Sequence, residues 1–273
     1  MMMLKRFIPM VLVLAFSLTL PVNATYNIIW VSENIDNDGD GVMDDQGWID
    51  LLATEGYSVD VQRNYWQSLD EEKINTLNST DLIIVSSSCT SENYINADET
   101  TQWNSITAPM ILSSTYLAES DNWRWIDSTT LIEDMGAPLM DIVDGSHPIF
   151  ANLLIDVLDE SVGSGNTTFL DTINVGNGEL IATAAEIDAA WIAEWQQGAE
   201  YFDGAGQYAG SHRMFFVAGT NASDGTPQGA YNLTPQGEVI FLSTVEYMIP
   251  EPATIVLLGL GGFILLQRRK IRP

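Results

Sequence analysis

Cysteine is nearly absent from this chain: Cys89 is the only one among 273 residues. A single cysteine cannot form an intramolecular disulfide, so the fold must be held together by its apolar core. Hydrophobic residues make up 46% of the sequence, which is enough for such a core. The composition therefore excludes the small, disulfide-stabilised class of proteins.

Positive charge is scarce between Thr25 and Pro250, where the only cations are Arg63, Lys73, Arg124 and Arg213. The same stretch holds every Asp and Glu of the chain except Glu251, and the whole chain has a formal net charge of −27. A surface this acidic repels the phosphates of nucleic acids, so we expect no nucleic-acid partner. It also favours divalent cations.

Long apolar runs are missing as well, since none reaches the ~20 residues of an ordinary membrane span. Two shorter runs lie at the ends of the chain. At the first, Lys5 and Arg6 precede the apolar stretch 7–20, and Ala24 closes a group of small residues. We predict a secretory signal peptide over residues 1–24, cleaved after Ala24 by signal peptidase once the general secretion machinery has engaged it. An uncleaved anchor is the less favoured alternative.

The second run follows Pro250, Glu251 and Pro252 directly, and four cations come after it: Arg268, Arg269, Lys270 and Arg272. A short apolar helix closed by cations is typical of a stop-transfer element, with the cations on the cytoplasmic side. We predict a transmembrane helix at about 253–267 with a basic cytoplasmic tail. An ordinary single-span anchor is the alternative, although Gly259, Gly261 and Gly262 lower the helix propensity.

The order of Pro-Glu-Pro, apolar helix and basic tail resembles the PEP-CTERM sorting signal. This resemblance implies an exported protein of a Gram-negative bacterium, recognised by an exosortase and processed near Pro250, Glu251 and Pro252. It implies a precursor inserted in the inner membrane, and then a protein at the cell surface or in an exopolysaccharide matrix. The chain thus divides into residues 1–24, a central domain at 25–249, and a sorting signal at 250–273.

The first half of the central domain alternates strands with helices. Apolar runs predict strands at 26–31, 57–61, 82–85 and 109–112. Between them we predict a helix capped by Asp45, a helix opened by a capping box at 68–71, and a helix at 98–106. This rhythm favours a parallel sheet with right-handed crossovers.

The second half is less regular. We predict strands at 179–183, 190–195 and 213–217, some of them antiparallel, and a closing helix at 233–248 that begins at Thr234 and Pro235. The segments 147–150 and 213–217, with this helix, resemble the ThuA-like branch of the class I glutamine amidotransferase-like superfamily. The resemblance implies an α/β fold, a flavodoxin-like sandwich with a mainly parallel central sheet. The superfamily's Gly-x-Cys-x-Gly nucleophile elbow is missing, which argues against amidotransferase activity.

An acidic loop follows the first predicted strand, and it has the alternating carboxylates of a calcium loop. The predicted oxygen ligands are Asp36, Asp38, Asp40, the Val42 carbonyl and Asp44. The twelfth loop position is Gly47 rather than a glutamate, so Asp45 or Asp50 would have to complete the shell. In a flavodoxin-like strand order this loop lies at the switch point, where ligands bind. The alternative is a solvated acidic turn that caps the first helix.

The loop after the third strand, residues 86–93, is expected to face the acidic loop across a crevice. Its Cys89 is a candidate nucleophile, with His147 or His212 as base. The alternatives are packing roles for all three residues, and no cation lies near Cys89 in sequence to stabilise a thiolate.

Aromatic side chains at Trp103, Tyr116, Trp123 and Trp125 either stack on a sugar ring or fill the core, and we favour the core. Two function classes remain. The favoured one is an exosortase-sorted protein of the cell surface or exopolysaccharide matrix, with a non-catalytic domain that binds calcium and a polysaccharide. The other is an exported hydrolase that acts on a glycan or related small molecule at the same crevice.

Overall fold

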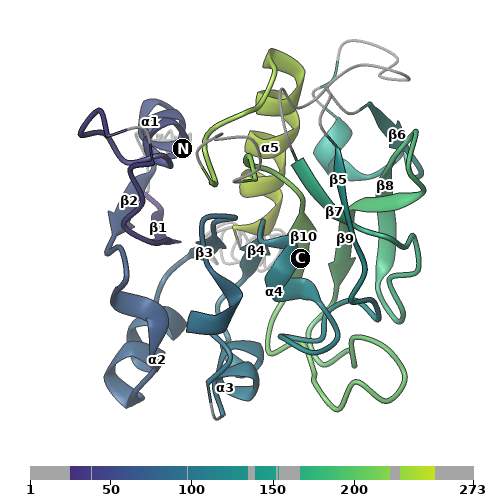
Figure 1. Ribbon diagram of the computed structural model, residues 1–273, viewed down its shortest axis with the longest axis horizontal. Helices are drawn as coiled ribbons and strands as arrows, with labels where there is room; N and C mark the ends of the chain where they lie inside the picture. Colours follow the sequence, from purple (N-terminus) through teal and green to yellow (C-terminus); the bar gives the residue numbers. More distant parts are fainter. Residues whose placement is uncertain are drawn as a thin grey trace, which may run out of the picture.

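The computed structural model of the protein describes residues 25–37, 39–96, 98–134, 139–151, 153, 167–221 and 228–249 (Figure 1). The predicted signal peptide, the transmembrane helix at about 253–267 and the basic tail lie outside these residues. Within the described part of the chain, no helix is long and apolar enough to cross a membrane.

One half of the central sheet is parallel. Its strands lie in the order β2 (Ser58–Val61), β1 (Asn27–Val31), β3 (Leu82–Val85), β4 (Met110–Leu112) and β10 (Arg213–Phe216), and each neighbouring pair is parallel. This is the flavodoxin-like order. All residues of β3 are buried, because helices cover both faces of the sheet at its centre.

The other half of the same sheet is antiparallel. It continues from β10 through β9 (Ala189–Trp195) and β8 (Glu179–Ala184) to β6 (Met140–Ile142), which gives a sheet of eight strands among the described residues. A separate two-stranded sheet joins β5 (Leu131–Asp134) and β7 (Thr167–Leu170). The prediction of a mainly parallel centre with antiparallel strands in the second half is confirmed.

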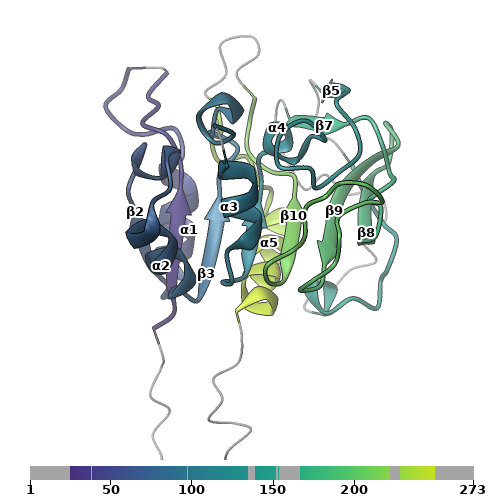
Figure 2. The ribbon, with the colours of Figure 1, turned by 90° about the horizontal axis from the view of Figure 1, so that it is seen from below.

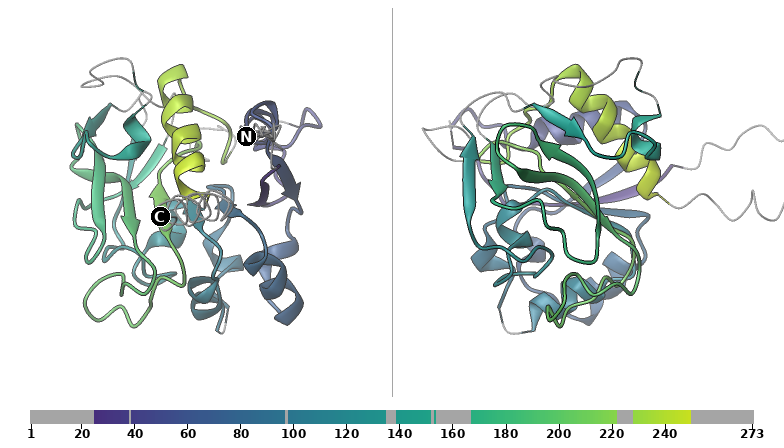
Figure 3. Two further views of the ribbon diagram at one scale, coloured as in Figure 1. Left: turned by 180° about the vertical axis from the view of Figure 1, so that it is seen from behind. Right: turned by 90° about the vertical axis from the view of Figure 1, so that its right-hand side faces the viewer.

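Helices cover the two faces of the sheet. The helices α1 (Gln46–Thr54) and α5 (Pro235–Met248) lie on one face, and α2 (Glu71–Asn78) and α3 (Glu99–Ser105) on the other (Figures 1 and 3). The rings of Trp48 in α1 and Phe241 in α5 pack edge to face, with 5.1 Å between centroids. The short elements are α4 (Thr115–Ala118), η1 (Tyr65–Gln67), η2 (Ser91–Asn93) and η3 (Pro148–Phe150).

The helix caps agree with the sequence only in part. Helix α5 begins as predicted, since the Thr234 hydroxyl accepts a hydrogen bond from the Gly237 amide at 3.2 Å. The predicted opening of α2 at Ser68 is wrong, because Asp70 is the N-cap and accepts from the Lys73 amide at 2.9 Å. Asp45 precedes α1, but its side chain makes no capping hydrogen bond.

Tryptophans fill the layer between the sheet and α3. Trp103, Trp123, Trp125, Trp195 and Tyr201 are all buried, and the rings of Trp125 and Tyr201 stack with 5.3 Å between centroids. The expectation that Trp103, Trp123 and Trp125 belong to the core is confirmed. Burial of each such ring stabilises the fold by about 3 kcal/mol.

The chain ends and the long loops lie at opposite edges of the parallel sheet. We call the edge where β1, β3, β4 and β10 begin the amino edge, and the edge where they end the carboxyl edge. Figure 2 shows that β1 begins and α5 ends at the amino edge, whereas the long loops after β1 and β3 lie at the carboxyl edge. The described segment therefore starts and finishes on the side opposite to these loops.

Candidate functional site

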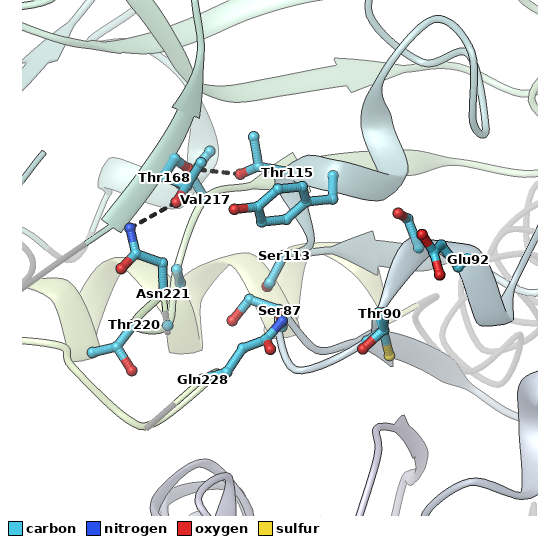
Figure 4. Close-up of a pocket in the computed structure, with 15 residues that line it drawn as sticks. Ser87, Thr90, Glu92, Ser113, Thr115, Thr168, Val217, Thr220, Asn221 and Gln228 are labelled. Carbon is cyan, nitrogen blue, oxygen red and sulfur yellow. Dashed lines mark hydrogen bonds between the residues drawn. The ribbon is translucent and has the colours of Figure 1, made fainter. Parts of the chain in front are cut away.

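A pocket of about 300 Å³ opens at the carboxyl edge, where β3, β4 and β10 end (Figure 4). Most of its lining consists of hydroxyl and amide side chains: Ser87, Thr90, Ser91, Ser113, Thr115, Tyr116, Thr168, Thr220, Asn221 and Gln228. The remaining described lining residues are Cys89, Glu92, Val217, Ala218 and Gly219. Ligands bind at this edge in open α/β sheets, so the position agrees with the fold.

The back wall of the pocket is fixed by hydrogen bonds between separate elements. The Thr115 hydroxyl in α4 donates to the Thr168 carbonyl in β7 at 2.7 Å. The Asn221 amide donates to the Thr168 hydroxyl at 2.9 Å (Figure 4). These bonds tie the segment after β4 and the segment after β10 to one strand, which makes the wall rigid.

The opposite rim of the pocket is held by two hydrogen bonds and contains two glycines. The Gln228 side-chain amide donates to the Ser87 carbonyl at 3.3 Å, and the Gly229 amide donates to the Thr220 carbonyl at 2.7 Å. Gly219 and Gly229 have φ values of +88° and +76°, in the left-handed region that favours glycine. Side chains at these two positions would meet the loop after β3.

The pocket lies one strand away from the predicted crevice. Glu33, which precedes the acidic loop, links the loops after β1 and β3 by hydrogen bonds. Its carboxylate accepts hydrogen bonds from the Thr90 amide at 3.0 Å, the Thr90 hydroxyl at 3.1 Å and the Asn93 side chain at 2.9 Å. The loop after β3 therefore meets Glu33, and its far side lines the pocket.

Cys89 is buried, and its thiol donates to the Val31 carbonyl at 3.4 Å. Burial raises the pKa of this thiol far above its usual range, so the thiolate is disfavoured. His212 directly precedes β10, at the amino edge, and His147 lies with it. The structure therefore does not bring Cys89 together with His147 or His212.

The two histidines instead flank one glutamate at the amino edge. The Nε2 atom of His212 lies 2.6 Å from Oε2 of Glu194, and Nε2 of His147 lies 3.7 Å from Oε1. The ring of Tyr247 packs edge to face on both imidazoles, with centroid distances of 4.9 and 5.4 Å. Burial acts to raise the pKa of Glu194, but the hydrogen bond and charge of His212, with smaller contributions from His147 and Tyr247, hold it below its usual range.

Sequence reasoning missed Glu194 and Tyr247 because four separate segments supply this cluster. It also missed the pocket residues after β4 and β10. A signal existed for those after β4, since Ser113 and Thr115 directly follow a short apolar strand. Of the aromatic group, Tyr116 lines the pocket while the three tryptophans are core.

The acidic loop turns back on itself. The Asp36 carboxylate accepts hydrogen bonds from the amides of Gly39 at 2.8 Å and Gly41 at 3.1 Å. Asp40 accepts from the Val42 amide at 2.7 Å. Gly39 and Gly41 have φ values of +72° and +86°, which permit the chain to turn in this way. The carboxylates of Asp36 and Asp40 thus both accept hydrogen bonds from amides of their own loop.

The end of the loop contains two acids with different surroundings. Asp44 accepts a hydrogen bond from the Asn37 amide at 3.3 Å and stays with the loop. Asp45 is buried, where it accepts from the Trp30 indole at 2.8 Å and forms an ion pair with Arg63 at 2.6 Å. The Asp45 carboxylate thus faces the sheet and helps to hold α1 in place.

Within the described residues, no group of three or more His, Cys, Asp or Glu side chains is arranged to hold a metal ion. Asp38, one of the predicted ligands, lies outside them, as do Ala24, Pro250, Glu251 and Pro252. Calcium binding stays a prediction.

Comparison with known proteins gives a match to a family model and a likeness to solved structures. Residues 249–270 match the PEP-CTERM protein-sorting motif. The chain carries this sorting signal, as its C-terminal residues predict, and the motif implies an exported protein processed by an exosortase. No curated protein matches the chain.

The fold is similar to the crystal structure of a protein from Bacteroides uniformis that is described as ThuA-like. The identity is 9%, the TM-score is 0.45, and the match covers 84% of this chain and 93% of the other. At this level of similarity the match gives no information on activity.

Proposed function

We propose that the protein is an exosortase-sorted surface or exopolysaccharide-matrix protein of a Gram-negative bacterium, whose α/β domain binds a glycan through one sugar residue. The pocket at the carboxyl edge carries the proposal. Its hydroxyl and amide side chains both donate and accept hydrogen bonds, as sugar hydroxyls do. A volume of about 300 Å³ lies at the small end of the range for ligand pockets, which fits one sugar residue better than a long chain.

Tyr116 adds an apolar surface to this polar lining. An aromatic ring beside hydroxyl groups suits a sugar, which has polar edges and a less polar face. The bond from Thr115 to Thr168 anchors the start of α4, the helix that carries Tyr116, so the ring has a fixed support.

Binding is favoured over hydrolysis because the described lining contains no histidine, lysine or arginine. A serine or threonine nucleophile needs a base within hydrogen-bonding distance, and Cys89 is buried as the neutral thiol. Glu92 is the one carboxylate among the described lining residues. An exported hydrolase acting on a glycan or related small molecule is the alternative.

The proposal is tested by saturation-transfer NMR and calorimetry on the purified domain with a panel of monosaccharides. We expect Tyr116→Ala to weaken binding by about 1 kcal/mol, roughly fivefold in Kd. Tyr208→Ala is the matched control, since this tyrosine is 55% exposed and lies outside the pocket. An equal loss in both variants, or no binding of any sugar, contradicts the proposal. Release of a product from a glycan would favour the hydrolase.

We further propose that the acidic loop binds calcium, with an affinity in the weak extracellular range of about 0.1–1 mM. The hydrogen bonds of Asp36 and Asp40 to amides of the same loop support this, because they hold two carboxylates on one short turn, as a calcium loop does. Asp38 and the Val42 carbonyl would contribute further ligands. Asp45 would stay with Arg63, so water would fill its place.

A further inference from the structure

The charge around the pocket is set by where the few cations of the domain lie. Arg63 is paired with Asp45 at 2.6 Å. The Lys73 ammonium donates to the carbonyls of Tyr65 at 2.5 Å and Ser68 at 2.6 Å. Both cations are therefore held by the helical segments beside β1 and β2.

The other two cations also donate hydrogen bonds to backbone carbonyls. Arg124 donates to the Ala205 carbonyl at 3.1 Å. Arg213 is fully buried and donates to the Ile106 carbonyl and, at 3.0 Å, to the Ala108 carbonyl. In the described part of the chain, no cation lines the pocket.

The charge that does line the pocket is negative. Glu92 lies in η2, with an exposed side chain, at the end of the pocket away from Thr168 and Asn221 (Figure 4). Glu33 lies on the other side of the same loop, where it accepts hydrogen bonds from Thr90. The hydroxyl-rich wall is therefore neutral, and one end of the pocket is anionic.

We propose that the pocket takes an amino sugar and excludes acidic saccharides, with Glu92 as the residue that sets this preference; this rests on the proposed function. The ammonium of the sugar would face Glu92, while its hydroxyls meet the neutral wall. A uronic acid would bring a second carboxylate towards Glu92 without a cation to pair with, and like charges at short range repel. The strongly acidic domain adds to both effects at low ionic strength.

The test compares glucosamine, glucose and glucuronic acid by calorimetry at about pH 6, where the amino group is charged. We expect glucosamine to bind about twofold to fivefold more tightly than glucose, and glucuronic acid more weakly than both, because an exposed ion pair contributes little. Glu92→Gln should abolish the difference between glucosamine and glucose, and rising salt should reduce it. Glu72→Gln, an exposed acid in α2 outside the pocket, is the matched control and should change nothing.

The results separate this inference from the proposed function. Equal binding of glucose and glucosamine, or a preference that Glu92→Gln leaves intact, overturns the inference while glycan binding stands. Tighter binding of glucuronic acid overturns it in the same way. Failure of all three sugars to bind removes the proposed function, and the inference with it.

Discussion

Replacing Gly229 by alanine tests how closely the rim of the pocket is packed. Gly229 has a φ of +76°, and its carbonyl accepts a hydrogen bond from the Trp48 indole at 3.1 Å. A Cβ atom at this position would lie 2.6 Å from the Ser88 amide nitrogen and 2.9 Å from the Ser88 Cα. Backbone cannot rotate away as a side chain can, so one of the two loops has to move.

The cost has two parts. A non-glycine residue in the left-handed region costs about 1–2 kcal/mol. The forced contact with Ser88 adds about 1–3 kcal/mol, as overpacking does in other tightly packed sites. We therefore expect Gly229→Ala to lower the free energy of unfolding by about 2–5 kcal/mol.

Gly204→Ala is the matched control. Gly204 has a similar φ of +89°, but no heavy atom lies within 4 Å of the position its Cβ would take. This variant should lose only the backbone part, about 1–2 kcal/mol. The difference in unfolding free energy between Gly229→Ala and Gly204→Ala measures the cost of the contact with Ser88.

The measurement is a urea titration of both variants, followed by the fluorescence of the buried tryptophans. Sugar affinity is measured under conditions where each variant is folded, and it should fall for Gly229→Ala alone, because the rim has to open. Equal stability losses in the two variants would refute the reasoning about a close approach at this rim.

Three further predictions concern other parts of the molecule. Cys89 should react with a maleimide only after unfolding in urea, since burial keeps its thiol neutral and covered; rapid labelling of the native protein would contradict this. The pKa of Glu194 is lowered in the fold, so its contribution to stability is present above its unfolded pKa of about 4.3 and is lost as the pH falls through the lower folded value. Glu194→Gln should therefore destabilise the protein above about pH 4.3, and the difference in unfolding free energy from the parent protein should narrow as the pH falls below that value; a constant difference in urea titrations across this range argues against the His212 interaction. Asp40→Asn should reduce the calorimetric heat of calcium binding by severalfold relative to Glu72→Gln, and no heat in the parent protein ends the calcium proposal.

The parallel half of the sheet could be predicted because each strand carries its own signal. The runs that form β1, β3 and β4 are short and apolar, and the segments between them are of helical length. The start of α5 was equally local, since a threonine followed by proline sets both the cap and the first helical φ. These features depend on residues close in sequence.

The remaining features depend on partners that are distant in sequence. The small sheet pairs β5 with β7 across a long intervening segment, and no turn signal marks the pairing. Nothing in the sequence near Glu33 indicates that its carboxylate binds the loop after β3. Nor does it indicate that the pocket lies beside the next strands, β4 and β10. The placement of His147 and His212 beside Glu194 likewise requires the finished fold.

The sorting motif begins at residue 249, directly after α5 ends at the amino edge. Any membrane enzyme that grips the chain there meets this edge of the domain, with the cluster of Glu194 and Tyr247 next to it. The pocket lies at the opposite, carboxyl edge. A strand of five residues such as β1 is roughly 16 Å long, so the amino edge and the pocket are separated by about that distance. A molecule held by its tail would thus have its pocket on the far side of the domain, so holding the tail would leave the proposed sugar site accessible.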